Sequence, residues 1–101
     1  MNTNIELVEV DADLEDLIPN FIQNRKKDIF DLNPMIQSKD LHAISQMAHR
    51  IKGSSSGYGF MGLSQIAAEM EQLSKNGNFE GIPALYERMN SYFDKIQVRY
   101  V

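Results

Sequence analysis

A short run near the middle of the chain reads Ala48-His49-Arg50-Ile51-Lys52-Gly53 and is followed by Gly59. Residues three and four apart lie on the same face of a helix, so Lys52 and Gly53 fall beside His49. Lys52 supplies a positive charge there, and Gly53 supplies open space in place of a side chain. An imidazole with a neighbouring cation and an unobstructed approach is suited to holding a phosphoryl group.

The helix that carries this run is predicted to extend from Asp40 to about Gly57. At 100° per residue its apolar positions fall within an arc of roughly 80°; they are Leu41, Ile44, Ala48, Ile51 and Ser55. His49 lies about 120° from the centre of that arc, so it is predicted to be exposed rather than part of the core.

The outward face around His49 is predicted to be low, because its side chains are polar or small: His42, Ser45, Gln46, Gly53 and Ser56. A surface helix normally fills such positions with long charged residues. A low face leaves the imidazole accessible to a docking partner. For Gly53 alone, close packing against a neighbouring helix is an open alternative.

Two further helices are predicted on the C-terminal side. One runs from about Phe60 to Lys75 and ends at Asn76-Gly77, a typical left-handed C-cap. Asn78 is expected to cap the last helix, whose buried stripe is predicted to comprise Leu85, Met89, Tyr92, Phe93 and Ile96.

On the N-terminal side, a helix is predicted from about Pro19 to Gln37, after a short turn at 13–18. Pro34 is expected to end or kink this helix near Leu32. Four amphipathic helices joined by short loops indicate an all-α fold, an antiparallel four-helix bundle.

Residues 4–10 alternate apolar and polar side chains, a weak strand signal, and no other segment offers a strand to pair with them. We therefore expect residues 1–12 to form an extended arm against the bundle. Residues 13–101 are expected to form a single helical domain.

The length, composition and net charge of the chain argue against several classes of function. At 101 residues the chain holds one domain, and the absence of cysteine excludes disulfides and thiolate metal sites. A net charge of −4 disfavours nucleic acid and anionic membranes as partners. With no signal peptide and no apolar run of bilayer length, a cytoplasmic location is expected. Met1 and the lack of a linker favour a free-standing protein.

A metal site shared by His42 and His49 is excluded, because seven residues of helix separate them by about 10.5 Å along the axis. The sequence offers no general acid, magnesium site or nucleotide cradle. No cofactor is therefore expected, and the metal ion for any phosphoryl transfer must come from the partner.

The motif His49-Arg50-Ile51-Lys52-Gly53, with Gly59 after it, resembles the H-x-[LIM]-K-G…G signature of histidine phosphotransfer (HPt) domains. These are the four-helix-bundle carriers of multistep two-component phosphorelays. The resemblance covers most of the chain, since residues 13–19 and 66–71 also resemble the corresponding parts of the family.

The resemblance implies a role for each residue of the motif. His49 would be the phosphoryl acceptor and Lys52 its charge partner. Gly53 and Gly59 would clear the docking surface and turn the chain. Glu71 stands where the family often has Gln or Glu, and it would hydrogen-bond the imidazole and orient it.

The function implied is that of a phosphoryl carrier without an autonomous catalytic site. His49 would accept the group from a phospho-aspartyl receiver domain, or from a histidine kinase or hybrid kinase, and pass it to a response-regulator receiver. Magnesium is expected on the receiver, and Arg50 with Lys52 would assist the encounter. Ser45, Gln46 and Ser56 are further candidates for the binding face.

A monomer is expected, because a dimer that buries the His49 face could not carry phosphate. The alternative function is a non-catalytic helical protein-interaction module with the same fold, in which His49 is merely exposed.

Overall fold

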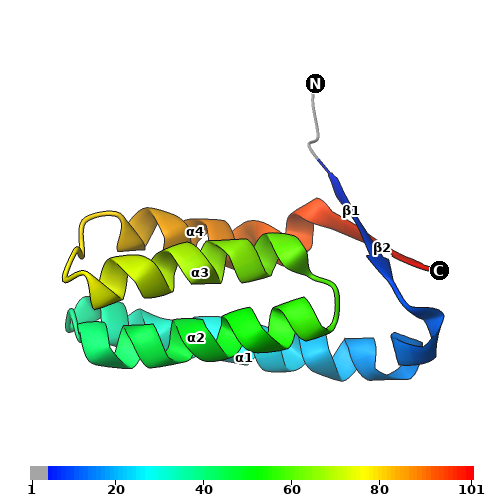
Figure 1. Ribbon diagram of the computed structural model, residues 1–101, viewed down its shortest axis with the longest axis horizontal. Coiled ribbons are helices and arrows are strands. Elements are labelled where there is room, and N and C mark those ends of the chain that lie inside the picture. Colours follow the sequence, from blue (N-terminus) through cyan, green and yellow to red (C-terminus); the bar gives the residue numbers. More distant parts are fainter. Residues whose placement is uncertain (1–4) are drawn as a thin grey trace.

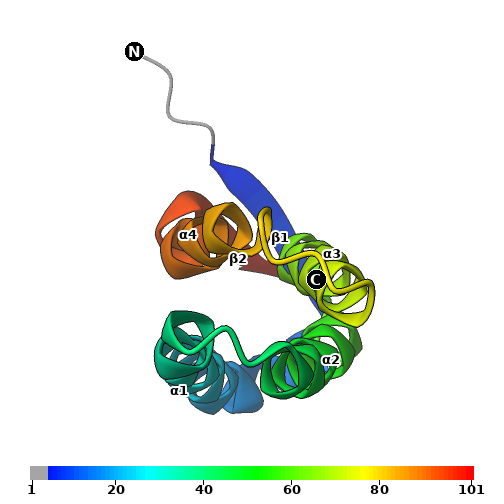
Figure 2. The same cartoon turned by 90° about the vertical axis from the view of Figure 1, so that its left-hand side faces the viewer.

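Within residues 5–101, which the structure describes, four helices account for most of the computed structural model (Figure 1). They are α1 (Ile18–Gln37), α2 (Leu41–Gly57), α3 (Met61–Lys75) and α4 (Ile82–Tyr92). The chain reverses direction at each connection, so consecutive helices are antiparallel. Both α1 and α3 pack against α2 and α4, and Figure 2 shows the four helices end-on around a common centre. The predicted antiparallel four-helix bundle is confirmed.

The ends of the helices follow local sequence signals. Asp40 caps α2, because its carboxylate accepts a hydrogen bond from the Ala43 backbone N–H at 3.1 Å. Gly77 takes the left-handed conformation, φ +74°, just after α3. The next N–H, of Asn78, then donates to the Leu73 carbonyl at 2.9 Å, which closes the predicted cap. The prediction that Asn78 caps the last helix is wrong: its side chain accepts from the Glu80 N–H in the loop, and α4 begins at Ile82, after Gly81, without a side-chain cap.

Helix α1 continues through Pro34 to Gln37 instead of ending near Leu32. Proline costs this helix one backbone hydrogen bond close to its end. The three N–H groups that follow, of Ser38, Lys39 and Asp40, bond back to carbonyls of the last turn at 3.0–3.1 Å. These bonds hold the last turn in place.

The predicted isolation of the N-terminal segment is wrong, because it pairs with the C-terminus. Strand β1 (Glu6–Val10) lies parallel to β2 (Ile96–Tyr100), with Val8 opposite Val98. Val8 and Val10 are buried, so β1 contributes to the core. Residues 1–4 of the predicted arm lie outside the described part of the chain.

The last predicted helix is correspondingly too long. Helix α4 ends at Tyr92, a 3₁₀ turn (Phe93–Lys95) follows, and Ile96 begins β2 instead of extending the helical stripe. Ile96, Val98 and Tyr100 are partly buried at every second position, which is strand spacing. A second 3₁₀ turn (Ala12–Leu17) joins β1 to α1, at the predicted turn.

The core lies between the four helices. Its largest fully buried side chains come from every helix and include Leu32, Ile44, Ile51, Leu63, Met70, Ile82 and Met89. Across residues 5–101, no helix combines the length and the apolar character that crossing a bilayer requires.

Candidate functional site

His49 lies on the outside of α2, with 68% of its side chain exposed. Its neighbours Ala48 and Ile51 are fully buried and fix the rotation of the helix about its axis. The predicted exposure of His49 is therefore confirmed.

Glu71 of α3 gathers the polar groups of the site. Its side chain is only 6% exposed, and its Oε2 lies 3.0 Å from Nδ1 of His49. Lys52 Nζ lies 2.8 Å from Oε1, and Lys75 Nζ lies 2.9 Å from Oε2. His49, Lys52 and Glu71, predicted from two separate segments, thus meet across the α2–α3 contact.

The cations determine the charge of this carboxylate. Hydrogen bonds from Lys52 and then Lys75 are the main causes that lower the pKa of Glu71 to about 2, with a smaller contribution from His49. Burial acts in the opposite direction but does not prevail. At neutral pH Glu71 is ionised and can only accept hydrogen bonds.

The ionisation of Glu71 determines which ring nitrogen of His49 carries the hydrogen. Because an ionised carboxylate accepts only, Nδ1 of His49 carries the hydrogen of this bond. In the neutral ring Nε2 then keeps its lone pair and has no hydrogen. Nε2 is the atom available for nucleophilic attack.

A hollow of about 470 Å³ opens beside the imidazole. Its lining consists of His42, Ser45, Gln46, His49, Glu71 and Lys75. Of the residues predicted to form a low face around His49, the hollow includes His42, Ser45 and Gln46 but not Gly53 or Ser56, and α3 forms its other side.

Gly53 lies one turn beyond His49 on the exposed surface of α2. A Cβ atom built there would meet no other atom within 4 Å, so the glycine is not required by a neighbouring helix. Ser56, also exposed, donates to the Gly53 carbonyl at 3.0 Å. The surface next to Lys52 is bare at this position.

Gly59 serves the turn between α2 and α3. Its φ is +92°, and an added Cβ would lie 3.3 Å from the Glu9 carbonyl oxygen of β1. This left-handed conformation, which glycine adopts readily, is where the chain turns from α2 to α3. Gly59 is not among the residues that line the hollow.

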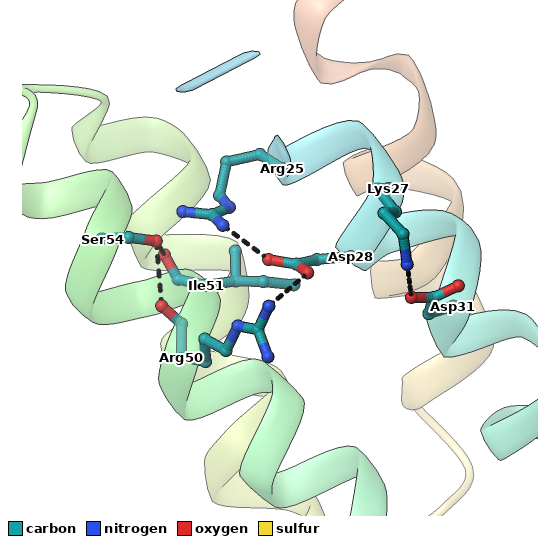
Figure 3. Close-up of polar contacts among 7 residues, drawn as sticks. All are labelled: Arg25, Lys27, Asp28, Asp31, Arg50, Ile51 and Ser54. Carbon is teal, nitrogen blue, oxygen red and sulfur yellow. Dashed lines mark hydrogen bonds and ion pairs between the residues drawn. The ribbon is translucent and has the colours of Figure 1, made fainter. Parts of the chain in front are cut away.

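Arg50 is directed away from the other candidate residues. Its Nη2 lies 3.1 Å from Asp28 Oδ1 of α1, and Asp28 also pairs with Arg25 at 2.9 Å (Figure 3). Although 64% of the Arg50 side chain is exposed, it does not line the hollow. The structure thus places this predicted site residue on the α1 side of α2.

Lys75 is the member of the cluster that sequence reasoning missed. It follows Glu71 by four residues on α3, the spacing at which a glutamate and a lysine pair on one helix face. That signal is present in the sequence, but it becomes informative only once Glu71 is known to contact His49.

Comparison with known protein families agrees with the fold and with the motif. The family model of the Hpt domain matches residues 6–98, from the first strand into the last. No curated protein and no solved structure gives a significant match. Hpt domains interact with receiver domains and kinases, and they are typically phosphoryl carriers rather than autonomous enzymes. With its four packed helices and a match over nearly its whole length, the chain belongs to the Hpt domain family, whose members carry out histidine phosphotransfer in phosphorelays.

Proposed function

We propose that His49 accepts a phosphoryl group from the phospho-aspartate of a receiver domain and passes it to the receiver of a response regulator. The observation that carries this proposal is the hydrogen bond from Nδ1 to the buried Glu71 carboxylate, which leaves Nε2 free at an exposed position. A histidine kinase or hybrid kinase is the alternative donor.

In the proposed transfer step, one bond to phosphorus forms as another breaks, and both partners supply the reacting groups. The Nε2 lone pair of His49 attacks phosphorus and forms the N–P bond. The P–O bond to the aspartate breaks, and its electron pair stays on the carboxylate oxygen. Glu71 faces the positive charge that develops on the ring, and Lys52 offsets the charge of the phosphoryl oxygens.

The receiver docks on the outward face of α2. The hollow that includes Ser45 and Gln46 admits its active-site loops, and Gly53 with Ser56 leaves room for its backbone. Arg50 lies at the α1 edge of this face, where its exposed guanidinium attracts an acidic receiver during the encounter. The receiver contributes the magnesium ion. The carrier works as a monomer in the cytoplasm, since the His49 face must stay open to successive partners.

The first prediction concerns the acceptor. His49→Gln is expected to abolish labelling from a phosphorylated receiver domain with Mg²⁺, because the amide has no nucleophilic nitrogen. Wild-type label is expected to be acid-labile and base-stable, as for a phosphohistidine. The measurement is transfer of ³²P from receiver domains of the same organism, with the fold of each variant checked by circular dichroism.

His42→Gln is the matched control, because His42 lines the same hollow two turns away on α2. It is expected to retain labelling. Label that persists in His49→Gln would disprove the assignment of the acceptor. A folded wild type that takes no label from any receiver would favour the non-catalytic interaction module.

A further inference from the structure

Glu71 pairs with two lysines that come from different helices. Lys52 reaches it from α2 at 2.8 Å, on Oε1. Lys75 reaches it from the next turn of α3 at 2.9 Å, on Oε2, the oxygen that also accepts from Nδ1 of His49. Because the Glu71 side chain is 6% exposed, water replaces these partners poorly.

The Lys52 ammonium group cannot keep its full ion pair with Glu71 and also pair with a phosphoryl group on His49. A phosphoryl group carries up to about two negative charges and attracts the nearest ammonium group. If Lys52 were the only partner, its move to the phosphoryl oxygens would leave a buried carboxylate without a cation. Breaking a buried ion pair in this way is strongly unfavourable.

We propose that Lys75 is a positioning residue that stays on Glu71 and thereby releases Lys52 to bind the phosphoryl group. This inference rests on the proposed function of His49. Lys75 suits the role because its place on α3, four residues from Glu71, keeps it on the carboxylate regardless of what α2 binds.

The need for Lys75 arises from the carboxylate at position 71. Two lysines against one carboxylate leave the site with a surplus of one positive charge beside His49. Loss of Lys75 cancels this surplus. With glutamine at 71, Lys52 alone restores the surplus, and the amide oxygen can still accept the hydrogen bond from Nδ1.

Labelling by phosphoramidate tests this charge balance without any partner protein. His49 Nε2 displaces ammonia from this small anionic donor, so the N–P bond to histidine forms as the donor's N–P bond breaks. Lys75→Met is expected to slow labelling of His49 roughly two- to fivefold. Lys75→Arg is expected to label at close to the wild-type rate. The double variant Glu71→Gln/Lys75→Met is expected to label faster than Lys75→Met. The rates are followed by phosphorus NMR.

Titration of the Glu71 carboxyl by carbon NMR gives a second readout that needs no phosphorylation. Because Lys75 helps to hold the pKa of Glu71 at about 2, Lys75→Met is expected to raise the midpoint of this titration. Lys27→Met is the matched control. It removes a surface lysine of α1 whose Nζ lies 2.9 Å from the Asp31 carboxylate four residues on (Figure 3).

The outcomes separate this inference from the function on which it rests. Wild-type labelling in Lys75→Met, or a double variant as slow as Lys75→Met, would overturn the role of Lys75. An unchanged Glu71 titration in Lys75→Met would also overturn it. Wild-type protein that takes no label on His49 would instead contradict the proposed acceptor, while the titration would still test the pairing.

Discussion

Two residues of the site have opposite surroundings, and each is informative for that reason. Glu71 is buried among three donors, whereas a Cβ added at Gly53 would meet nothing within 4 Å. The first arrangement explains how the imidazole is oriented. The second leaves the space that the proposed docking of a receiver requires at this position.

Substitutions at Gly53 separate the stability of α2 from docking. Gly53→Ala is expected to raise the free energy of unfolding by about 0.5–1 kcal/mol, because alanine favours the helix and the space is open. Gly53→Gln keeps the helix but adds a long side chain. It is expected to slow transfer from a phosphorylated receiver about tenfold, as for a loss of ~1.4 kcal/mol in docking.

Urea unfolding and transfer rates provide these two measurements. Labelling by phosphoramidate is the control, and it is expected to be unchanged in both variants because no receiver docks. Transfer from the receiver at the wild-type rate in Gly53→Gln would show that this position lies outside the docking surface.

The residues of the site differ in how far the sequence could reveal them. The spacing on one helix was enough to predict His49, Lys52 and Gly53, and the resemblance to the family supplied Glu71. Lys75 could not be singled out, because a glutamate and a lysine four residues apart occur on many solvated helix faces. Only the burial of Glu71 against His49 makes its pairing significant.

The contact between α1 and α2 contains a buried charge. Asp28 is 3% exposed and lies between Arg25 of its own helix and Arg50 of α2 (Figure 3). Arg25 is itself 9% exposed, and its guanidinium lies over the Phe21 ring, 5.5 Å from the centroid. This carboxylate therefore links the helix that carries His49 to its neighbour.

Asp28→Ala is expected to lower the free energy of unfolding by about 3 kcal/mol, because it leaves the buried Arg25 without its counter-charge. Asp31→Ala is the matched control on the same helix. It breaks the pair with Lys27, whose side chain is 74% exposed, and a change below ~1 kcal/mol is expected. Urea unfolding of both variants makes the comparison. Equal small losses would show that the Asp28 pairs contribute little.

The helices could be predicted because each carries an apolar stripe, and local signals such as Asp40 and Gly77 mark some of their ends. The pairing of the strands could not be predicted. Strand β2 begins at Ile96, which also fits the helical stripe of α4 one turn after Tyr92. Its partner β1 lies at the opposite end of the sequence, where residues 4–10 show only a weak alternation. The pairing of two strands that only the tertiary fold brings together leaves no local signal.

In the described part of the molecule, the two strands near the chain ends and the His49 cluster are separate. The β1–β2 sheet lies at the end of the bundle where α2 turns into α3 (Figure 1). There the Glu9 carbonyl approaches Gly59, and Val8 enters the core at 3% exposure. The His49 cluster lies further along the α2–α3 contact and includes no residue of either strand.

Val8→Ala is therefore expected to weaken the fold without changing the chemistry of His49. Loss of two buried methyl groups should lower the free energy of unfolding by about 2 kcal/mol. Leu7→Ala, on the exposed side of the same strand, should change it by less than ~0.5 kcal/mol. Both variants are expected to take label from phosphoramidate at the wild-type rate while folded. Slower labelling of folded Val8→Ala would mean that the terminal sheet controls the geometry around Glu71, because an independent sheet can change only the fraction of folded molecules.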